Sequence, residues 1–305
     1  LSLAFPGISR ARQYAIARRF AGAYLETIGV QPPQAGSVDH RDPGRALRIG
    51  YLSADFREHA VSHLLTGVLE QHDRERVEVF GYSYGPNDGS DIRARVERAC
   101  SIFRDLSSMS DDEAARQIRA DHIDILIDLT GWTAAGRPEI LAYRPAPVQA
   151  SWLGYPGTLG DARLADYLIG DPVVTPHEHA DDYAETLALM PNSYQPNDRS
   201  RKIGPRPTRQ AAGLPDHGFV FCAFNQAYKF NPEVFDIWCR LLAQVNGSVL
   251  WLLAVGEPAQ ANLRRWASER GVLPDRIVFA ERLPAELHLG RLQLADLALD
   301  TWPYN

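Results

Sequence analysis

The sequence predicts an α/β protein made of two doubly wound halves. Short apolar runs alternate with amphipathic segments of about a dozen residues, the pattern of parallel βαβ units, in two separate stretches of the chain. A segment rich in Pro, Asn and Arg separates the two stretches. The length of 305 residues also fits two domains, since a domain has roughly 150 residues. We therefore divide the chain into an N-terminal helix and linker (1–45), a first domain (46–190), a linker (191–216) and a second domain (217–305).

The composition argues against several classes of protein. Hydrophobic residues make up 45% of the chain and charged residues 23%, as in ordinary globular proteins. The net charge of −6 and the lack of a basic stripe argue against nucleic-acid binding. Cys100, Cys222 and Cys239 form no CxxC pair, which argues against a disulfide framework or a zinc ribbon. No apolar run reaches the ~18 residues of a membrane span and no signal peptide is visible, so we expect a cytoplasmic protein without a membrane partner.

The first half follows the expected alternation. Apolar residues at helical spacing predict a helix at 9–28, and the Pro/Gly-rich segment 31–45 follows it. Strands are expected at 46–53, 77–84, 101–106, 124–131, 147–154 and 165–171. Helices are expected at 61–71, 91–100 and 111–122.

The second half repeats the pattern in fewer elements. Strands are expected at 219–225, 248–254, 276–280 and 297–304, and helices at 232–245, 259–271 and 285–296. The helix at 232–245 places one set of apolar side chains on a single face: Val234, Phe235, Trp238, Leu241, Leu242 and Val245. Because a doubly wound domain normally has more elements, we expect this half to be truncated and the chain to be one segment of a longer protein.

Polar residues at strand ends carry the most weight, because ligands of doubly wound sheets bind at the carboxyl edge. The first cluster, "YLSADFREHAVSHL", contains Asp55, His59 and His63. A zinc site is one interpretation, although HExxH is absent and no third ligand is obvious. A helix cap with surface histidines is the second, and a histidine suited to proton transfer is the third.

Three further clusters follow strands. The loop "SWLGYPGTLGDA" departs from the GxGxxG fingerprint but could touch a phosphate or sugar, and Tyr155 is its substrate-binding candidate. In "FNQAYKFNP", Gln226 offers an amide and Lys229 a charge where a helix is about to begin, a place that favours anions; a solvated lysine is the alternative. In "AERLPAELHLGRLQLAD", His288 and Arg291 lie on a helix that could simply be a surface helix.

Two motifs are missing from the sequence. Without a Walker A motif, a P-loop kinase is not expected. No Asp-x-Asp motif is present to hold a metal on a diphosphate. We therefore expect no metal site, and a bound diphosphate would be balanced by lysine, arginine, backbone amides and helix dipoles.

Taken together, these clusters resemble a known family. The segments "RIGYLSADFREHAVSHL", "RPAPVQASWLGYPGT", "FNQAYKFNPEVFDIWCRLLAQVNGSVLWLL" and "RLQLADLALDT" are similar to the catalytic region of O-linked N-acetylglucosamine transferases, from about Leu47 to Thr301. The resemblance implies a GT-B fold, with two Rossmann-like domains facing across a cleft. It also implies inverting, metal-independent transfer of N-acetylglucosamine from UDP to serine or threonine hydroxyls of proteins. The tetratricopeptide repeats that precede this region in the family are missing here.

The resemblance also implies roles for single residues. His59 matches a histidine near the sugar that has been considered as a general base, and Asp55 matches its acidic neighbour. Gln226 and Lys229 match residues that hold UDP, with the lysine on the pyrophosphate. His288 matches a position near the uracil, Arg291 a position around the nucleotide, and Leu283 a loop whose backbone meets the base. Ala285 stands where the animal enzymes have a lysine.

The implied partners are a UDP-sugar donor and a protein or peptide acceptor, with no cofactor; a homo-oligomer is compatible with the sequence. Two alternatives remain open. One is a protein O-fucosyltransferase that uses GDP-fucose, since a few side chains build the sugar pocket. The other is a non-catalytic protein that binds nucleotide sugars, against which Asp55, His59 and Lys229 argue.

Overall fold

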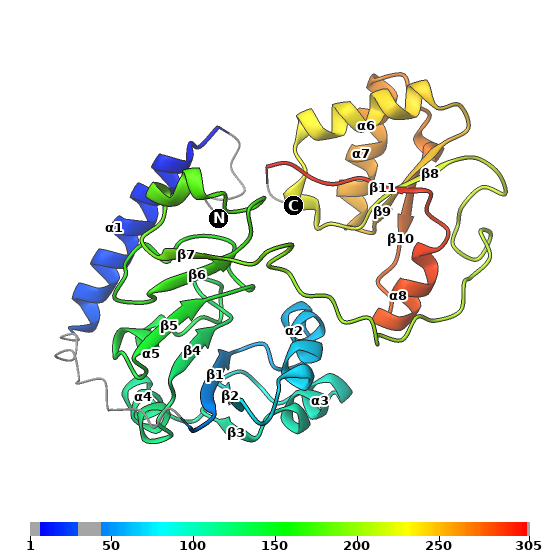
Figure 1. The fold of residues 1–305 in the computed structure, drawn as a ribbon. Helices are drawn as coiled ribbons and strands as arrows, with labels where there is room; N and C mark the ends of the chain where they lie inside the picture. Colours follow the sequence, from blue (N-terminus) through cyan, green and yellow to red (C-terminus); the bar gives the residue numbers. More distant parts are fainter. Residues whose placement is uncertain (1–6, 30–43, 304–305) are drawn as a thin grey trace. The chain divides into compact units, whose positions relative to one another are not determined.

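The chain folds into two compact units (Figure 1). The computed structural model describes residues 7–29 and 44–303. The first unit spans Ser9–Ser200 and the second contains the chain from Arg201 onward. Most of the predicted linker at 31–45 lies outside the described residues. Residues 191–216 contain no helix or strand.

The first unit is built on a seven-stranded sheet in which every neighbouring pair is parallel (Figure 1). The strand order is β3-β2-β1-β4-β5-β6-β7, which extends the Rossmann order by one strand. The order reverses between β1 and β4, so this pair marks the topological switch point. The strands are β1 (Leu47–Ser53), β2 (Val77–Ser83), β3 (Ile102–Asp105), β4 (Ile125–Asp128), β5 (Val148–Ser151), β6 (Tyr167–Gly170) and β7 (Thr186–Leu189).

Helices cover both faces of this sheet, because each crossover between parallel strands is right-handed and the order reverses once. One apolar cluster joins the sheet to α2 (Ala60–Gln71) and α3 (Asp91–Ala99). The opposite cluster joins it to α1 (Arg10–Ile28), α4 (Asp111–Ala120) and α5 (Pro138–Ala142). With both faces covered, the central strands are apolar on both sides, as their sequences predict.

The second unit repeats the beginning of the same topology. Its parallel sheet has the order β10-β9-β8-β11, formed by β8 (Val220–Ala223), β9 (Val249–Leu253), β10 (Ile277–Ala280) and β11 (Leu297–Ala298). One face packs on α6 (Pro232–Gln244) and α7 (Glu257–Glu269). Leu294, which follows α8 (Ala285–Leu292), packs on the other face. The switch point of this sheet lies between β8 and β11.

Most of the expected elements are confirmed, with differences at their ends. The helix at 9–28 starts after Ser9, whose side chain accepts the Arg12 N–H, and Asn231 caps α6 in the same way. Several expected strands are shorter; for example, 124–131 ends at Asp128 and 297–304 ends at Ala298. In the first case the Asp128 carboxylate bonds the following backbone and turns the chain. The pattern analysis missed α5 and β7, which have only five and four residues.

The cysteines differ in burial. Cys222 and Cys239 are buried and Cys100 is partly exposed, and all three are free thiols.

None of the helices in residues 7–29 and 44–303 combines the length and apolarity that a bilayer crossing requires.

An ion pair with a buried carboxylate ties the edge of the first sheet to the helix beside it. Asp121, at the end of α4, accepts two hydrogen bonds from Arg104 at 2.5 and 2.7 Å and one from Tyr82 Oη at 2.8 Å. Burial alone would raise the pKa of Asp121, but the hydrogen bonds from Arg104 and Tyr82 outweigh it and lower the pKa. The charged form is therefore the one that stabilises the fold.

We expect Asp121→Asn to lower the free energy of unfolding by about 2 kcal/mol at pH 7, the order of a charged hydrogen bond lost from a buried site. A carboxyl with a lowered folded pKa stabilises fully above its unfolded pKa near 4 and loses this contribution as the pH falls. The difference from wild type should therefore shrink in acid, as urea denaturation at several pH values will show. Asp112→Asn, which removes an exposed pair with Arg116, should have a much smaller effect, because solvent screens such a pair. An equal effect of the two variants would contradict the assignment.

Candidate functional site

The loop after β1 places Asp55 at the switch point of the first sheet. Asp55 is 6% exposed, and its backbone is held at both ends. Its N–H donates to Ser53 Oγ at 2.9 Å, and its carbonyl accepts from Ser62 Oγ at 2.6 Å. Arg57 Nη2 lies 3.4 Å from its carboxylate. The carboxylate is therefore fixed at the carboxyl edge, where the sequence predicted a polar site.

His59 is the N-cap of α2 rather than a residue on its face. Its Nδ1 accepts the Val61 N–H at 3.3 Å, which requires a lone pair on Nδ1 and a proton on Nε2. The same Nδ1 lies 3.7 Å from Asp55 Oδ2. A shift of the proton from Nε2 to Nδ1 would exchange the cap for a contact with this carboxylate and leave Nε2 able to accept a proton. His63, in the first turns of the same helix, contacts Glu58 at 2.7 Å.

The turn after β4 lies across the switch point from Asp55. The Asp128 carboxylate accepts the backbone N–H groups of Thr130 at 3.3 Å and Gly131 at 2.8 Å. Thr130 Oγ1 in turn accepts the Ala54 N–H at 3.3 Å. Asp128 is 4% exposed, and burial raises its pKa to about 6 because these two N–H groups offset the lost solvation only in part. The sequence analysis treated 124–131 as strand throughout, although an Asp directly before Leu-Thr-Gly is a turn signal.

The loop after β5 carries Tyr155 and approaches the β4 turn closely. Leu153 has φ 70°, in the left-handed region. A Cβ on Gly154 would lie 1.8 Å from the Leu129 carbonyl oxygen, and a Cβ on Gly131 would lie 2.5 Å from Tyr155 Cβ. Glycine is therefore required at both positions for the two loops to pack.

A second buried carboxylate, Glu185, supports the far end of this loop. It accepts from Thr158 Oγ1 and from the Leu159 N–H, both at 2.6 Å. Burial raises its pKa against these hydrogen bonds. The N-terminal helix packs on the same region: Trp132 donates to the Leu159 carbonyl and stacks edge-on against Phe20 and Tyr24 of α1.

In the second unit, Gln226 and Lys229 lie in the connection after β8. Gln226 precedes a short 3₁₀ helix, Ala227–Lys229, and the Lys229 N–H bonds the Gln226 carbonyl at 2.9 Å. Asn225 Nδ2 donates to Thr301 Oγ1 at 2.9 Å, which links the loops after β8 and β11. Lys229 therefore stands between the switch point and the N-terminus of α6.

His288 and Arg291 form one unit on α8. Arg291 is 4% exposed, which excludes a purely surface role. Its Nε donates to His288 Nδ1 at 3.0 Å, and its guanidinium lies over the Phe224 ring at 4.8 Å from the centroid. Burial, followed by the charge of Arg291, lowers the pKa of His288. The imidazole is thus neutral with its proton on Nε2, so that it presents a donor beside Phe224, whose ring it meets edge-on.

The predicted residues fall into two groups. Asp55, His59 and Tyr155 belong to the first unit, where the side chains of Asp55 and His59 contact each other. Gln226, Lys229, Leu283, His288 and Arg291 belong to the second unit. Leu283 is 43% exposed and lies between β10 and α8. Among the described residues, no group of three His, Cys, Asp or Glu side chains is arranged to hold a metal ion.

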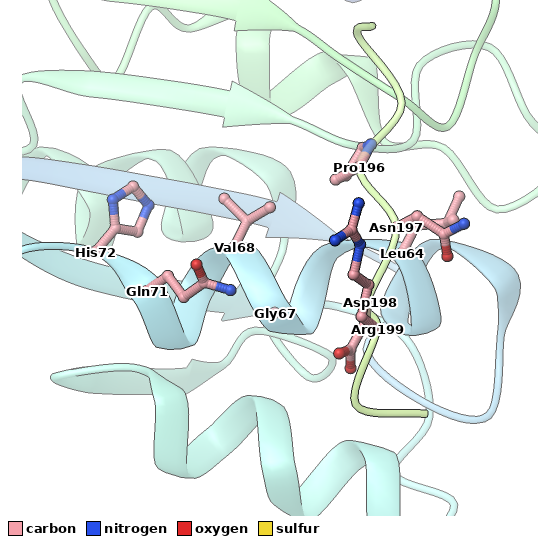
Figure 2. Close-up of a pocket in the computed structure, with 9 residues that line it drawn as sticks. All are labelled: Leu64, Gly67, Val68, Gln71, His72, Pro196, Asn197, Asp198 and Arg199. Carbon is pink, nitrogen blue, oxygen red and sulfur yellow. The ribbon is translucent and has the colours of Figure 1, made fainter. Parts of the chain in front are cut away.

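A pocket of about 480 Å³ lies elsewhere in the first unit (Figure 2). It opens between α2 and the segment at 196–199. Its residues are Leu64, Gly67, Val68, Gln71, His72, Pro196, Asn197, Asp198 and Arg199. None of them was predicted as a site residue. Asp198 lies beside Gly67, and Arg95 Nη1 contacts its carboxylate at 2.8 Å. This ion pair therefore fixes one wall of the pocket and the last residues of the first unit.

Known proteins are similar to this chain over most of its length. The model of glycosyl transferase family 41 matches residues 2–204 and 199–305. The probable UDP-N-acetylglucosamine–peptide N-acetylglucosaminyltransferase SEC of Arabidopsis thaliana is 42% identical over 274 residues, which are 88% of this chain and 28% of that protein. The UDP-N-acetylglucosamine–peptide N-acetylglucosaminyltransferase of Caenorhabditis elegans is 31% identical over 418 residues, covering 98% of this chain and 36% of that protein. The chain thus spans about a third of the length of these relatives.

A solved structure is similar along almost the entire chain. A mutant O-GlcNAc transferase from Thermobaculum terrenum superposes with a TM-score of 0.83 at 30% identity, covering 99% of this chain and 56% of that one. This likeness, together with the two parallel sheets, confirms the predicted GT-B fold class.

Proposed function

Because the chain belongs to glycosyl transferase family 41, we propose that it is the catalytic region of an enzyme that transfers N-acetylglucosamine from UDP to serine or threonine hydroxyls of proteins. The observation that carries this proposal lies in the second unit. At the carboxyl edge of its Rossmann-like sheet, the neutral imidazole of His288 is bonded to Arg291, and the cation Lys229 follows β8. The relatives named as UDP-N-acetylglucosamine–peptide transferases support the choice of donor and acceptor.

We assign the nucleotide to the second unit. His288 presents its Nε2–H as a donor, which suits a carbonyl oxygen of a uracil base. The buried guanidinium of Arg291 holds the imidazole in that tautomer through the bond to Nδ1. Leu283 supplies exposed apolar surface and backbone near the same helix. Gln226 adds an amide at the end of β8.

We assign the diphosphate to Lys229. The β-phosphate gains negative charge as the bond to the sugar breaks, so a fixed ammonium stabilises the transition state more than the bound substrate. The N-terminus of α6, capped by Asn231, adds a partial positive charge next in the chain. We propose that this arrangement serves in place of a metal ion and that the anomeric centre inverts.

We assign proton transfer to His59 and Asp55 in the first unit. For His59 to accept a proton on Nε2, its Nδ1 must carry the other proton and donate toward Asp55, now 3.7 Å away. Such a carboxylate orients the imidazole and stabilises the cation that forms. The binding of an acceptor is expected to bring this exchange about, since catalytic hydrogen bonds often tighten only in the complex. Tyr155 is assigned to the sugar or acceptor.

Donor choice tests the proposal against its alternative. A protein restored to its full length should transfer N-acetylglucosamine to a peptide from UDP-N-acetylglucosamine and leave GDP-fucose unused, also in excess EDTA. Calorimetry should show UDP binding tighter than GDP. Transfer of fucose from GDP-fucose would favour the fucosyltransferase, and nucleotide-sugar binding without turnover would favour a non-catalytic binding protein. Activity that EDTA abolishes and manganese restores would contradict the metal-free mechanism.

Lys229→Ala should weaken UDP binding and slow turnover by about 10²–10³-fold, as the loss of one preorganised charge does. Lys229→Arg should recover part of the activity, because a planar guanidinium replaces a compact ammonium imperfectly. Lys202→Ala is a matched control, since Lys202 and Lys229 are the only two lysines in the sequence. Calorimetry and thermal denaturation of the three variants separate binding from folding. If Lys229→Ala binds UDP as tightly as wild type, the diphosphate lies elsewhere.

His59→Ala should lower kcat by roughly 10²–10⁴-fold, the usual contribution of a positioned acid–base group. The affinity for UDP should stay near that of wild type, because His59 belongs to the first unit and the nucleotide is assigned to the second. His63→Ala provides the control on the same helix. Steady-state kinetics on a peptide acceptor make the comparison, and equal turnover of the two variants would leave His59 as a helix cap only.

A further inference from the structure

Asp128 is a buried carboxylate at the switch point of the first sheet that the proposed chemistry does not use. It ends β4 with a 4% exposed side chain, and both of its hydrogen bonds go to backbone N–H groups of the next three residues. No cation is among the groups that shift its pKa. The Asp128 carboxylate therefore lies in a buried environment that disfavours its charged form, although a neutral turn residue could have ended the strand.

The turn that Asp128 holds reaches the Asp55 loop through Thr130. Thr130 Oγ1 accepts the N–H of Ala54, the residue directly before Asp55. The Thr130 hydroxyl also bonds Tyr84, which follows β2. Since Asp128 bonds the N–H of Thr130 itself, the position of this hydroxyl depends on the carboxylate. The backbone entering Asp55 thus rests on a side chain that Asp128 orients.

The same turn reaches the Tyr155 loop through Gly131. Gly131 has φ 54°, and its N–H bonds Asp128 at 2.8 Å. A Cβ on this glycine would come within 2.5 Å of Tyr155 Cβ, so backbone and side chain are already in contact there. One carboxylate therefore controls the backbone against which two predicted site residues, Asp55 and Tyr155, are placed.

We propose that Asp128 is a positioning residue for the transfer reaction, which sets the places of Asp55 and Tyr155 through Thr130 and Gly131. The proposal rests on the function proposed above. Loss of the carboxylate releases the β4 turn while the sheet stays paired, because no strand hydrogen bond involves the Asp128 side chain. The main consequence is a displaced pair of loops at the carboxyl edge. A displacement of about 1 Å at a catalytic group can cost 10²-fold in rate.

Asp171 offers a matched control at the same edge of the sheet. It directly follows β6 and is also 4% exposed. Its carboxylate accepts the backbone N–H groups of Val173, Val174 and Tyr194. Tyr194 in turn accepts a hydrogen bond from Trp152, so the Asp171 turn borders the loop after β5 from its far side. A variant at Asp171 therefore removes the same kind of turn at this edge while the hydrogen bonds of the β4 turn stay in place.

The experiment compares Asp128→Ala, Asp128→Asn, Thr130→Val and Asp171→Ala by peptide glycosylation kinetics. Asp128→Ala and Thr130→Val should lower kcat by about 10- to 100-fold, while KM for UDP-N-acetylglucosamine changes by less than about threefold. Asp128→Asn keeps one acceptor oxygen and should recover most of kcat. Asp171→Ala should lower stability and leave kcat near wild type. A wild-type kcat in folded Asp128→Ala or Thr130→Val, or an equal loss in Asp171→Ala, would overturn the proposal.

Hydrogen–deuterium exchange gives a second measurement that needs no activity. Asp128→Ala and Thr130→Val should exchange faster than wild type at residues 53–59, and Asp171→Ala should not. If Asp128→Ala does not fold, Thr130→Val carries the test in both measurements. If the wild-type protein transfers no sugar, the proposed function fails. The exchange data still test whether the β4 turn holds the loop at residues 53–59. Unchanged exchange at 53–59 in Thr130→Val would then refute the link from the β4 turn to Asp55.

Discussion

One hydrogen bond across the switch point recurs in both units, and the candidate sites are arranged around it. In the first unit the Ala54 N–H donates to Thr130 Oγ1 at 3.3 Å; in the second the Asn225 amide donates to Thr301 Oγ1 at 2.9 Å. At a switch point the two chains leave the sheet toward opposite faces, so groups at the strand ends lose their ladder partners. A threonine hydroxyl accepts the Ala54 backbone N–H in the first unit and the Asn225 side-chain amide in the second, and it holds the two loops together in each. The polar residues that follow are thereby presented from fixed backbone.

The two switch points differ in charge, and this difference supports a division of roles. The first has the carboxylates of Asp55 and Asp128, which suit orientation of an imidazole and of backbone amides. The second has Lys229, the start of α6 and, on the helix after β10, the buried Arg291. Positive charge and a helix N-terminus suit a nucleoside diphosphate. An overall charge of −6 conceals this asymmetry, which is why net charge alone indicates so little about the site.

The fold could be predicted from the sequence because its signals are local. Apolar runs and helical spacing located nearly every strand and long helix, and caps such as Ser9 and Asn231 marked their starts. Strand ends likewise located Asp55, Lys229 and Arg291. The tertiary partners were not predictable in this way. Nothing near Asp128 in sequence shows that its turn contacts Ala54, which is separated by 74 residues, and α5 and β7 are too short for a periodic pattern.

The buried charges separate structural groups from candidates for function. The Asp121 carboxylate is buried and paired with Arg104. Its pKa is lowered, so the hydrogen bonds it accepts more than offset the loss of solvation. The pKa of Asp128 is raised and those of Arg291 and His288 are lowered, with burial as the leading cause each time. Burial thus opposes the charged form of all three groups, and burying such a charged form lowers the free energy of unfolding. A charge retained against such a penalty is better explained by what it holds in place or binds than by stability. On this physical criterion, Asp128 belongs with Arg291, and Asp121 belongs with the core.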